Sequence, residues 1–165
     1  MAATYATLAD PVSAVVDLLS NNWSEVASGV GNNLTSAGGT VKIDESWDMG
    51  KYNLKNNDVI RCYEVSGGHE MLGIGKGVDR HTASIAIDMS TAVSRDRLRR
   101  LYTGVVHLIH AARSDSLAAA PFSSHASTSD YASIVLTSRS DLSDRNRRWY
   151  RYVLNCEITS YEVVN

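Results

Sequence analysis

Residues 94–112 repeat apolar side chains at the 3.6-residue period of an α-helix, and this stripe limits what the chain can fold into. Ser94 stands just before it, at the position where a hydroxyl caps a helix by accepting a backbone hydrogen bond. The stripe consists of Leu98, Leu101, Tyr102, Val105, Leu108, Ile109 and Ala112, with Val106 at its margin. Because so wide an apolar face must be covered by a second layer, the chain has to supply a matching apolar surface elsewhere.

Four segments with the period-two pattern of strands predict that surface. Residues 58–65 and 131–138 are rich in β-forming side chains, and residues 82–90 alternate apolar and small or polar positions. A long final strand, from about residue 147 to 164, places five side chains on one face: Tyr150, Tyr152, Leu154, Cys156 and Ile158. The apolar parity then shifts to Tyr161 and Val163, which predicts a bulge or bend near Thr159-Ser160.

Asp10-Pro11 predicts the start of another helix, because aspartate caps helices and proline suits their first position. Its apolar face holds Val12, Val15, Val16 and Leu19, and the pattern ends near Asn21-Asn22. The order helix, strands, helix, strands predicts one α+β domain over residues 1–165. In this fold both helices pack on one face of a mainly antiparallel sheet.

Two segments between these elements have little periodicity. Residues 24–57 contain only short apolar islands, at 40–43 and at Trp47, and are predicted to form a long irregular excursion that is functional or mobile. Residues 114–130, rich in alanine and serine, are predicted to form a surface loop.

The stretch LGIGKGVDRHT, residues 72–82, has the glycine content of a phosphate-binding loop. It lacks both the P-loop spacing and the glycine spacing that opens a dinucleotide-binding helix, and the residues after Lys76 are strand-like. The glycine segment 67–77 is therefore predicted to be an exposed connection between strands, without a bound anion.

The composition is that of an ordinary globular protein, with 44% hydrophobic and 21% charged residues in 165. No apolar run is long enough to span a membrane, and the N-terminal residues lack the features of a secretory signal. Cys62 and Cys156 each lie in a strand-like run and are expected to be buried free thiols, with a disulfide as the alternative if the two strands are adjacent. Together these features favour an intracellular origin.

The residues that could carry chemistry are scattered. No nucleophile is paired with a base, and neither cysteine has the partner spacing of a zinc site. His107 and His110 lie on the polar side of the second predicted helix without a nearby acid, so a solvated face is favoured over a metal site. We therefore expect no enzymatic activity, no catalytic residue, no cofactor and no metal.

Arginine is concentrated in two places, at 95–100 and at 145–151. On the helical wheel Arg95 and Arg99 flank one side of the apolar face, Arg97 flanks the other and Arg100 lies at the back. A helix that reads a nucleic-acid groove usually carries its basic residues on one side. The spread of these arginines around the helix therefore favours solvation or several subunit contacts.

The tract RNRRWYRY, residues 145–152, interleaves arginines with aromatics, as single-strand-binding platforms do. Tyr150 and Tyr152 continue the inward parity, so Trp149, Arg151 and Val153 are predicted to share the other face, where an interface anchor is the favoured interpretation. The predicted interface residues are Trp47, Arg97, Arg100, Trp149, Arg151 and Val153. The alternative is a nucleic-acid-binding module that uses both arginine clusters.

The order of parts over about residues 10–160 resembles the tail-terminator or tail-completion proteins of tailed viruses. The parts are ADPVSAVVDLL, VIRCYEV, LGIG, SIAIDMST, SRDRLRRLY and DLSDRNRRWYRYVLNCEI. The likeness is to the versions found in viruses of archaea. It rests on the pattern of elements, and no single residue is diagnostic.

The resemblance implies a structural role in the virion, with assembly in the host cytoplasm. Members of this family form a ring, usually of six small α+β subunits, between the tail tube and the head connector. The ring stops growth of the tube and leaves a channel through which viral DNA passes. The partners it implies are other copies of the chain, the tail tube protein and the head–tail connector. A related neck or tail-tube subunit is the neighbouring alternative.

Overall fold

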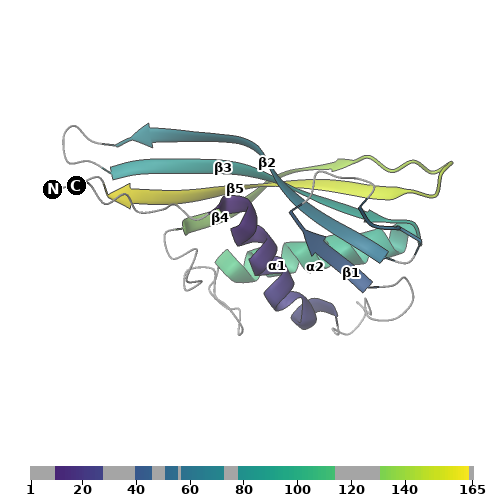
Figure 1. The fold of residues 1–165 in the computed structure, drawn as a ribbon. Helices are drawn as coiled ribbons and strands as arrows, with labels where there is room; N and C mark the ends of the chain where they lie inside the picture. The colour runs from purple at the N-terminus through teal and green to yellow at the C-terminus, as the bar shows by residue number, and fades with distance from the viewer. Residues whose placement is uncertain are drawn as a thin grey trace.

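The computed structural model describes residues 10–27, 40–45, 51–55, 57–72, 78–113 and 131–163. Its elements are α1 (Pro11–Ala27), β1 (Thr40–Asp44), β2 (Asn57–Met71), β3 (Val78–Thr91), α2 (Arg95–Arg113), β4 (Tyr131–Asp141) and β5 (Tyr150–Val163). The strands form one sheet in the order β1-β2-β3-β5-β4, antiparallel except for the β1–β2 pair. Both helices lie on one face of this sheet (Figure 1), which confirms the predicted α+β fold.

The core lies between the helices and the inner face of the sheet. The predicted stripe of α2 is confirmed, because Leu98, Leu101, Val105, Leu108 and Ile109 are fully buried. The sheet covers this stripe with side chains that alternate along its central strands: Ile60, Cys62, Ile85, Ile87, Met89, Tyr152, Leu154, Cys156 and Ile158.

The two helices approach each other closely at Gly104. A Cβ atom added there would lie 3.3 Å from the side chains of both Trp23 and Val26 on α1. Contacts that short are tighter than packed side chains normally tolerate, so the missing side chain of Gly104 makes room for α1.

Both helix starts are as predicted, but the end of α1 is not. Asp10 accepts a hydrogen bond from the Val12 N–H at 2.9 Å, and Ser94 accepts one from the Arg97 N–H at 3.0 Å. Yet α1 continues past Asn21-Asn22 to Ala27. Asn22 is buried, and its side-chain amide donates to the Leu18 carbonyl at 2.8 Å. This hydrogen bond satisfies the buried amide group, so the helix can continue past a polar residue on its buried face.

Within the predicted excursion, residues 24–57, the structure describes the last turn of α1, strand β1, residues 45 and 51–55, and the first residue of β2. Trp47 and the loop predicted at 114–130 lie outside the described residues.

The β2–β3 hairpin is longer than the sequence pattern predicted. Gly67 and Gly68 belong to β2 and pair with Ala83 and Thr82, so they are strand residues, and the connection is shorter than the predicted 67–77. Their exposure is as predicted. The Leu72 N–H donates to the Val78 carbonyl at 2.8 Å at the end of the ladder, and residues 73–77, including Lys76, lie outside the described part.

The bulge or bend predicted near Thr159-Ser160 is not in β5 itself, although β4 has an extra residue opposite this point. β5 pairs with β3 without a shift through Thr159 and Ser160, and Ser160 is buried while Tyr161 is exposed. The irregularities are in the neighbouring strand β4, between Tyr131 and Ser133 and between Leu136 and Ser138. β4 also extends to Asp141.

We expect Leu101→Ala and Leu108→Ala each to lower the free energy of unfolding by about 2–5 kcal/mol, the range for cavities in packed cores. His107→Ala is the matched control on the same helix, because His107 is exposed, and it should cost far less. Urea unfolding of the three variants measures this. Equal losses for His107→Ala and Leu108→Ala would show that the helix face is wrongly assigned.

Candidate functional site

The outer face of the sheet, away from the helices, holds a buried group of charges contributed by three adjacent strands. Asp88 on β3 accepts hydrogen bonds from Arg151 of β5, at 3.0 Å from Nε and 2.7 Å from Nη2. Arg61 of β2 donates from Nη2 to the same carboxylate at 3.1 Å. The register explains this meeting, because Arg61 pairs directly with Asp88, and Arg151 pairs with Ser90, two residues further along β3.

This group carries more positive than negative charge. Asp88 is 1% exposed and Arg61 4% exposed, so one carboxylate balances two guanidinium groups largely out of water. The hydrogen bonds to Asp88 are the main reason why the pKa of Arg151 is raised above its ordinary value. The Arg61 Nε atom is buried with no hydrogen-bond partner. Asp88 therefore joins three strands, and its charge makes the burial of both arginines tolerable.

Three of the predicted interface residues lie together on this outer face, as their parity predicted, although none is freely exposed. Trp149, Arg151 and Val153 are all half-buried. The Arg151 guanidinium lies over the Trp149 ring, 5.5 Å from its centroid, while the Trp149 Nε1 atom is buried without a partner. The side chains of Trp149 and Arg151 thus already contact each other within the subunit.

Arg97, another predicted interface residue, is on the inner side of the subunit. It is 4% exposed and forms an ion pair with Asp58 of β2, with Nη2 2.6 Å and Nε 2.7 Å from Oδ2. The helical wheel predicted that Arg97 lies at the margin of the apolar face of α2. The wheel could not show its partner, because the Asp58 carboxylate belongs to β2. The prediction of Arg97 as a surface contact is therefore corrected, because it joins α2 to the sheet.

The start of α2 is tied to β4 by polar contacts that face the helix. Arg95 donates to Asp141 at 2.8 Å, and the Arg139 guanidinium lies 5.0 Å from the Tyr102 ring centroid and 5.2 Å from that of Tyr152. Arg139 and Asp141 pair with Leu154 and Tyr152, which face the helices, because the irregularity near Thr137 changes the parity of β4.

Arg100, the remaining predicted interface residue in the described part, is half-buried and pairs with Asp96 at 2.8 Å, one turn away on α2. The role of Arg100 in a subunit contact stays a prediction.

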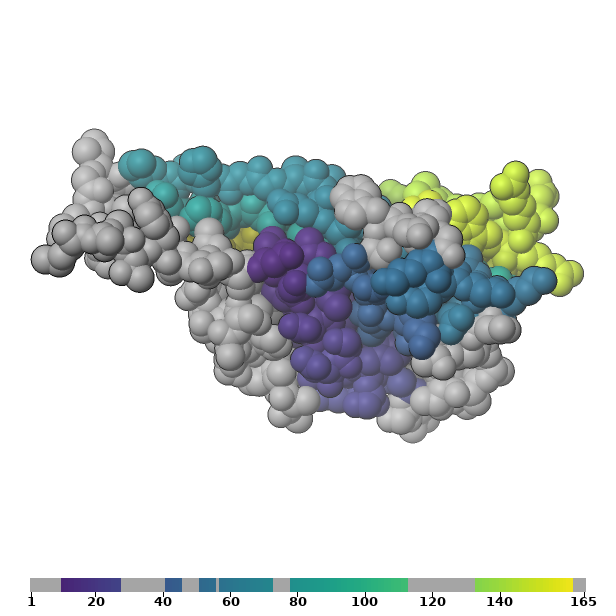
Figure 2. Space-filling model, in the orientation of Figure 1, coloured from purple at the N-terminus to yellow at the C-terminus, as the bar shows by residue number. Residues whose placement is uncertain are grey.

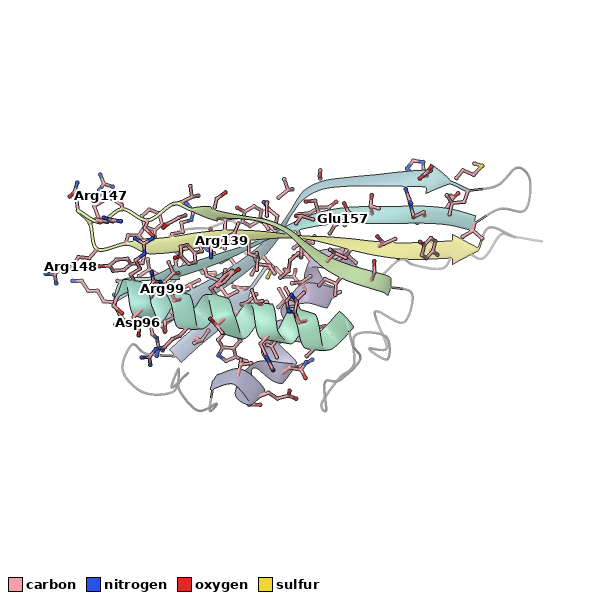
Figure 3. All side chains as sticks on the ribbon, turned by 180° about the vertical axis from the view of Figure 1, so that it is seen from behind. Asp96, Arg99, Arg139, Arg147, Arg148 and Glu157 are labelled. Atoms are coloured by element: carbon pink, nitrogen blue, oxygen red, sulfur yellow. The ribbon has the colours of Figure 1, made fainter. Side chains whose placement is uncertain are left out.

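The β4–β5 hairpin ends in a basic loop, residues 145–148, that projects from the body (Figure 3). Asp144 and Trp149 close the loop with two backbone hydrogen bonds, of 2.7 and 3.0 Å. The Asp144 carboxylate also accepts from the N–H groups of Asn146 and Arg147, and Arg148 adopts a left-handed φ of 50°. All four loop residues are exposed, so this loop presents Arg145, Arg147 and Arg148 on an ordered backbone.

At the opposite end of the sheet, β2, β3 and β5 extend beyond the helices as an arm (Figures 1 and 2). From Glu64 to Met71, β2 is exposed on both of its faces. His69 and His81 pair across the two strands with ring centroids 6.2 Å apart. No group of three or more potential metal ligands occurs in the part of the chain that the structure describes.

Cys62 and Cys156 are buried free thiols, as predicted. Burial raises the pKa of Cys156 to about 12 and that of Cys62 well above its ordinary value. At neutral pH both therefore stay protonated, the unreactive state of a cysteine.

The sequence interpretation missed the two buried ion-pair groups. The signal of the group on the outer face is an arginine inside the apolar run VIRCYEV and an aspartate inside SIAIDM. Each charge interrupts a strand pattern that otherwise predicts burial, and buried charges need partners. The partner itself could be identified only from the strand register.

Comparison with known proteins leaves the site without a family assignment, since no protein-family model matches the chain and no curated protein matches it in sequence. Among the described residues, no helix is both long enough and apolar enough to cross a membrane.

We expect Asp88→Asn to lower the free energy of unfolding by about 3–5 kcal/mol, because it leaves two largely buried guanidinium groups without a counter-charge. Asp96→Asn is the control, since it removes an equivalent charge from an exposed pair, and exposed pairs contribute little. Denaturant unfolding at neutral pH measures both. If the two variants lost equal stability, Asp88 would not hold the outer face together.

Proposed function

We propose that the chain is a structural subunit of the head–tail neck of a tailed virus. In this proposal it is a ring-forming tail terminator that caps the tail tube, joins it to the head connector and leaves a channel for DNA. The resemblance of the element order to such proteins, in particular those of archaeal viruses, is the starting point. The two helices on one face of a mainly antiparallel sheet agree with what that resemblance implies for the fold.

The observation that best supports an assembling subunit is the sheet that extends past its helices at both ends (Figure 1). On the arm, Val65, Met71 and Leu72 are 58%, 68% and 50% exposed. Apolar side chains gathered on a projecting arm are a feature of contact surfaces, because covering them releases ordered water. Trp149 and Val153 add half-buried apolar surface on the outer face.

The finer parts of the proposal come from the resemblance alone. They are a ring of six copies, contacts with the tail tube protein and the head–tail connector, and a place in the neck of the virion. Viral DNA would pass through the lumen without sequence-specific binding. Another neck or tail-tube subunit would share the ring architecture.

The alternative, a nucleic-acid-binding module, is favoured by one observation, the exposed Arg145, Arg147 and Arg148 at the hairpin tip. Arginines that project on an ordered loop suit phosphate contacts. Other members of the two clusters are already engaged within the subunit, because Arg97 pairs with Asp58 and Arg151 with Asp88. The structure therefore leaves a smaller basic surface than the sequence suggested.

Sedimentation velocity with the purified wild-type chain tests the proposal. A closed ring of six should sediment with about six times the 18.0 kDa mass of the subunit, and its size should stay constant over a range of protein concentrations. A chain that remains monomeric at high concentration, also when tail tubes are present, would contradict the ring.

Binding to duplex and single-stranded DNA should be measured alongside, over a series of salt concentrations. Tight binding that falls steeply with salt, and that is lost when Arg145, Arg147 and Arg148 are all replaced by alanine, would establish the alternative. Weak binding, unchanged by this triple substitution, is expected of a ring subunit that lets DNA pass.

A further inference from the structure

We propose that the free edge of β2, residues 62–71, pairs with the free edge of β4 in a second copy of the chain, so that the sheet continues from subunit to subunit. This contact would be the one through which the proposed ring assembles. That the contacts close into a ring rests on the proposed function. The pairing itself follows from the strand order and register of one subunit.

Within the described part of the chain, no further strand pairs with either edge along the arm of the sheet. β1 pairs only with Asn57–Arg61, so among the described residues no strand lies beside the outer edge of β2 from Cys62 onward. β4 is the last strand at the other side of the sheet. Unpaired backbone N–H and C=O groups along such edges are a template for another strand.

The edges carry a few charged side chains, Glu64 and Glu70 on β2 and Arg139 and Asp141 at the end of β4, but neither of the two residue types that most often block pairing. No lysine or proline occurs in residues 62–71 or 131–141. Natural proteins commonly place these two residues on edges that must stay free. Each edge does contain an irregularity, at Val65 in β2 and near Ala132 and Thr137 in β4, which leaves Ser133–Leu136 as the regular part of β4.

The two open edges lie at the same level of the sheet. Val135 pairs with Glu157, Glu157 pairs with Ser84, and Ser84 pairs with Ser66, so these residues form one row across four strands. The adjacent residues form a second row, because Ile134 pairs with Ile158, Ile158 with Ala83, and Ala83 with Gly67. A neighbouring copy that pairs along these rows would continue the rows of this sheet across the boundary between the two subunits.

The directions of the strands agree as well. β2, β3, β5 and β4 alternate in direction, because each adjacent pair is antiparallel. β2 and β4 therefore run in opposite directions, so β4 of a neighbour related by rotation about an axis along the strands would lie antiparallel to β2. The joined sheet would keep its alternation at the boundary.

Exposed apolar side chains mark the same level on both edges. Val65 of β2 is 58% exposed, and Val135 of β4 is 39% exposed. Val65 is the extra residue of the β2 irregularity and precedes Ser66, the residue in the row of Val135, so pairing at this level would place the two valines at neighbouring positions. Neighbouring β-branched side chains on paired strands stabilise a sheet, and the contact would remove both from water.

The second copy is expected to contribute β4 rather than β2. A two-fold contact between two β2 edges would leave both β4 edges, and Val135 with them, exposed. The β2–β4 contact uses two different surfaces, so every copy in a ring can satisfy both of its edges.

Cysteine cross-linking tests the contact. Val65→Cys and Val135→Cys are prepared separately, mixed as dilute proteins, concentrated and treated with a short bismaleimide. Cross-linked dimers are expected in the mixture and in neither variant alone. The variant that carries both cysteines should give a ladder that ends at the ring number. The native thiols do not interfere, because both are buried and have raised pKa values.

Leu142→Cys is the control, because Leu142 is similarly exposed but follows the end of β4 away from this row. It should not cross-link to Val65→Cys. Efficient dimers of Val65→Cys alone would show a two-fold β2 contact and overturn the proposal. A ring by sedimentation without cross-links in the mixture would also overturn it while leaving the proposed function intact. A ladder without end would support the edge contact and contradict the closed ring.

Discussion

The packing of α2 against the inner face of the sheet is the interaction on which the rest of the structure depends. Leu98, Leu101, Val105, Leu108 and Ile109 are removed completely from water there. The central strands β3 and β5 provide the opposing surface, and α1 completes the layer beside Gly104. Because this layer uses only one face of the sheet, the long strands extend past the helices at both ends, whereas the outer face buries Arg61, Asp88 and Ser90.

The buried charges follow from this one-sided arrangement. Arg97 and Asp58 join α2 to β2 at the edge of the apolar layer, whereas Arg61, Asp88 and Arg151 join three strands on the opposite face. Breaking a buried ion pair is strongly destabilising, so a strand shift that separated these partners would be costly. The same register aligns the two open edges at the level of Val65 and Val135.

Much of the fold was predictable because its signals are local. The stripe of α2, the caps at Asp10 and Ser94 and the alternation in β3 each depend on neighbouring residues along the chain. The errors arose where distant contacts decide. α1 passes Asn22 because Trp23 and Val26 pack beside Gly104, and Arg139 turns toward α2 because of an irregularity in β4 that only strand pairing reveals. The position of Arg97 on α2 could be predicted from the helical period, but its partner Asp58 could not, because Asp58 lies on β2.

We propose that this subunit assembles into a closed ring through surfaces that the helices leave uncovered. Negative-stain electron microscopy of the purified wild-type chain tests it most directly, because class averages show both closure and the number of copies. We expect uniform rings with a central channel, and the resemblance implies six copies in each ring. Single particles of subunit size, or two-fold dimers without a channel, would contradict it.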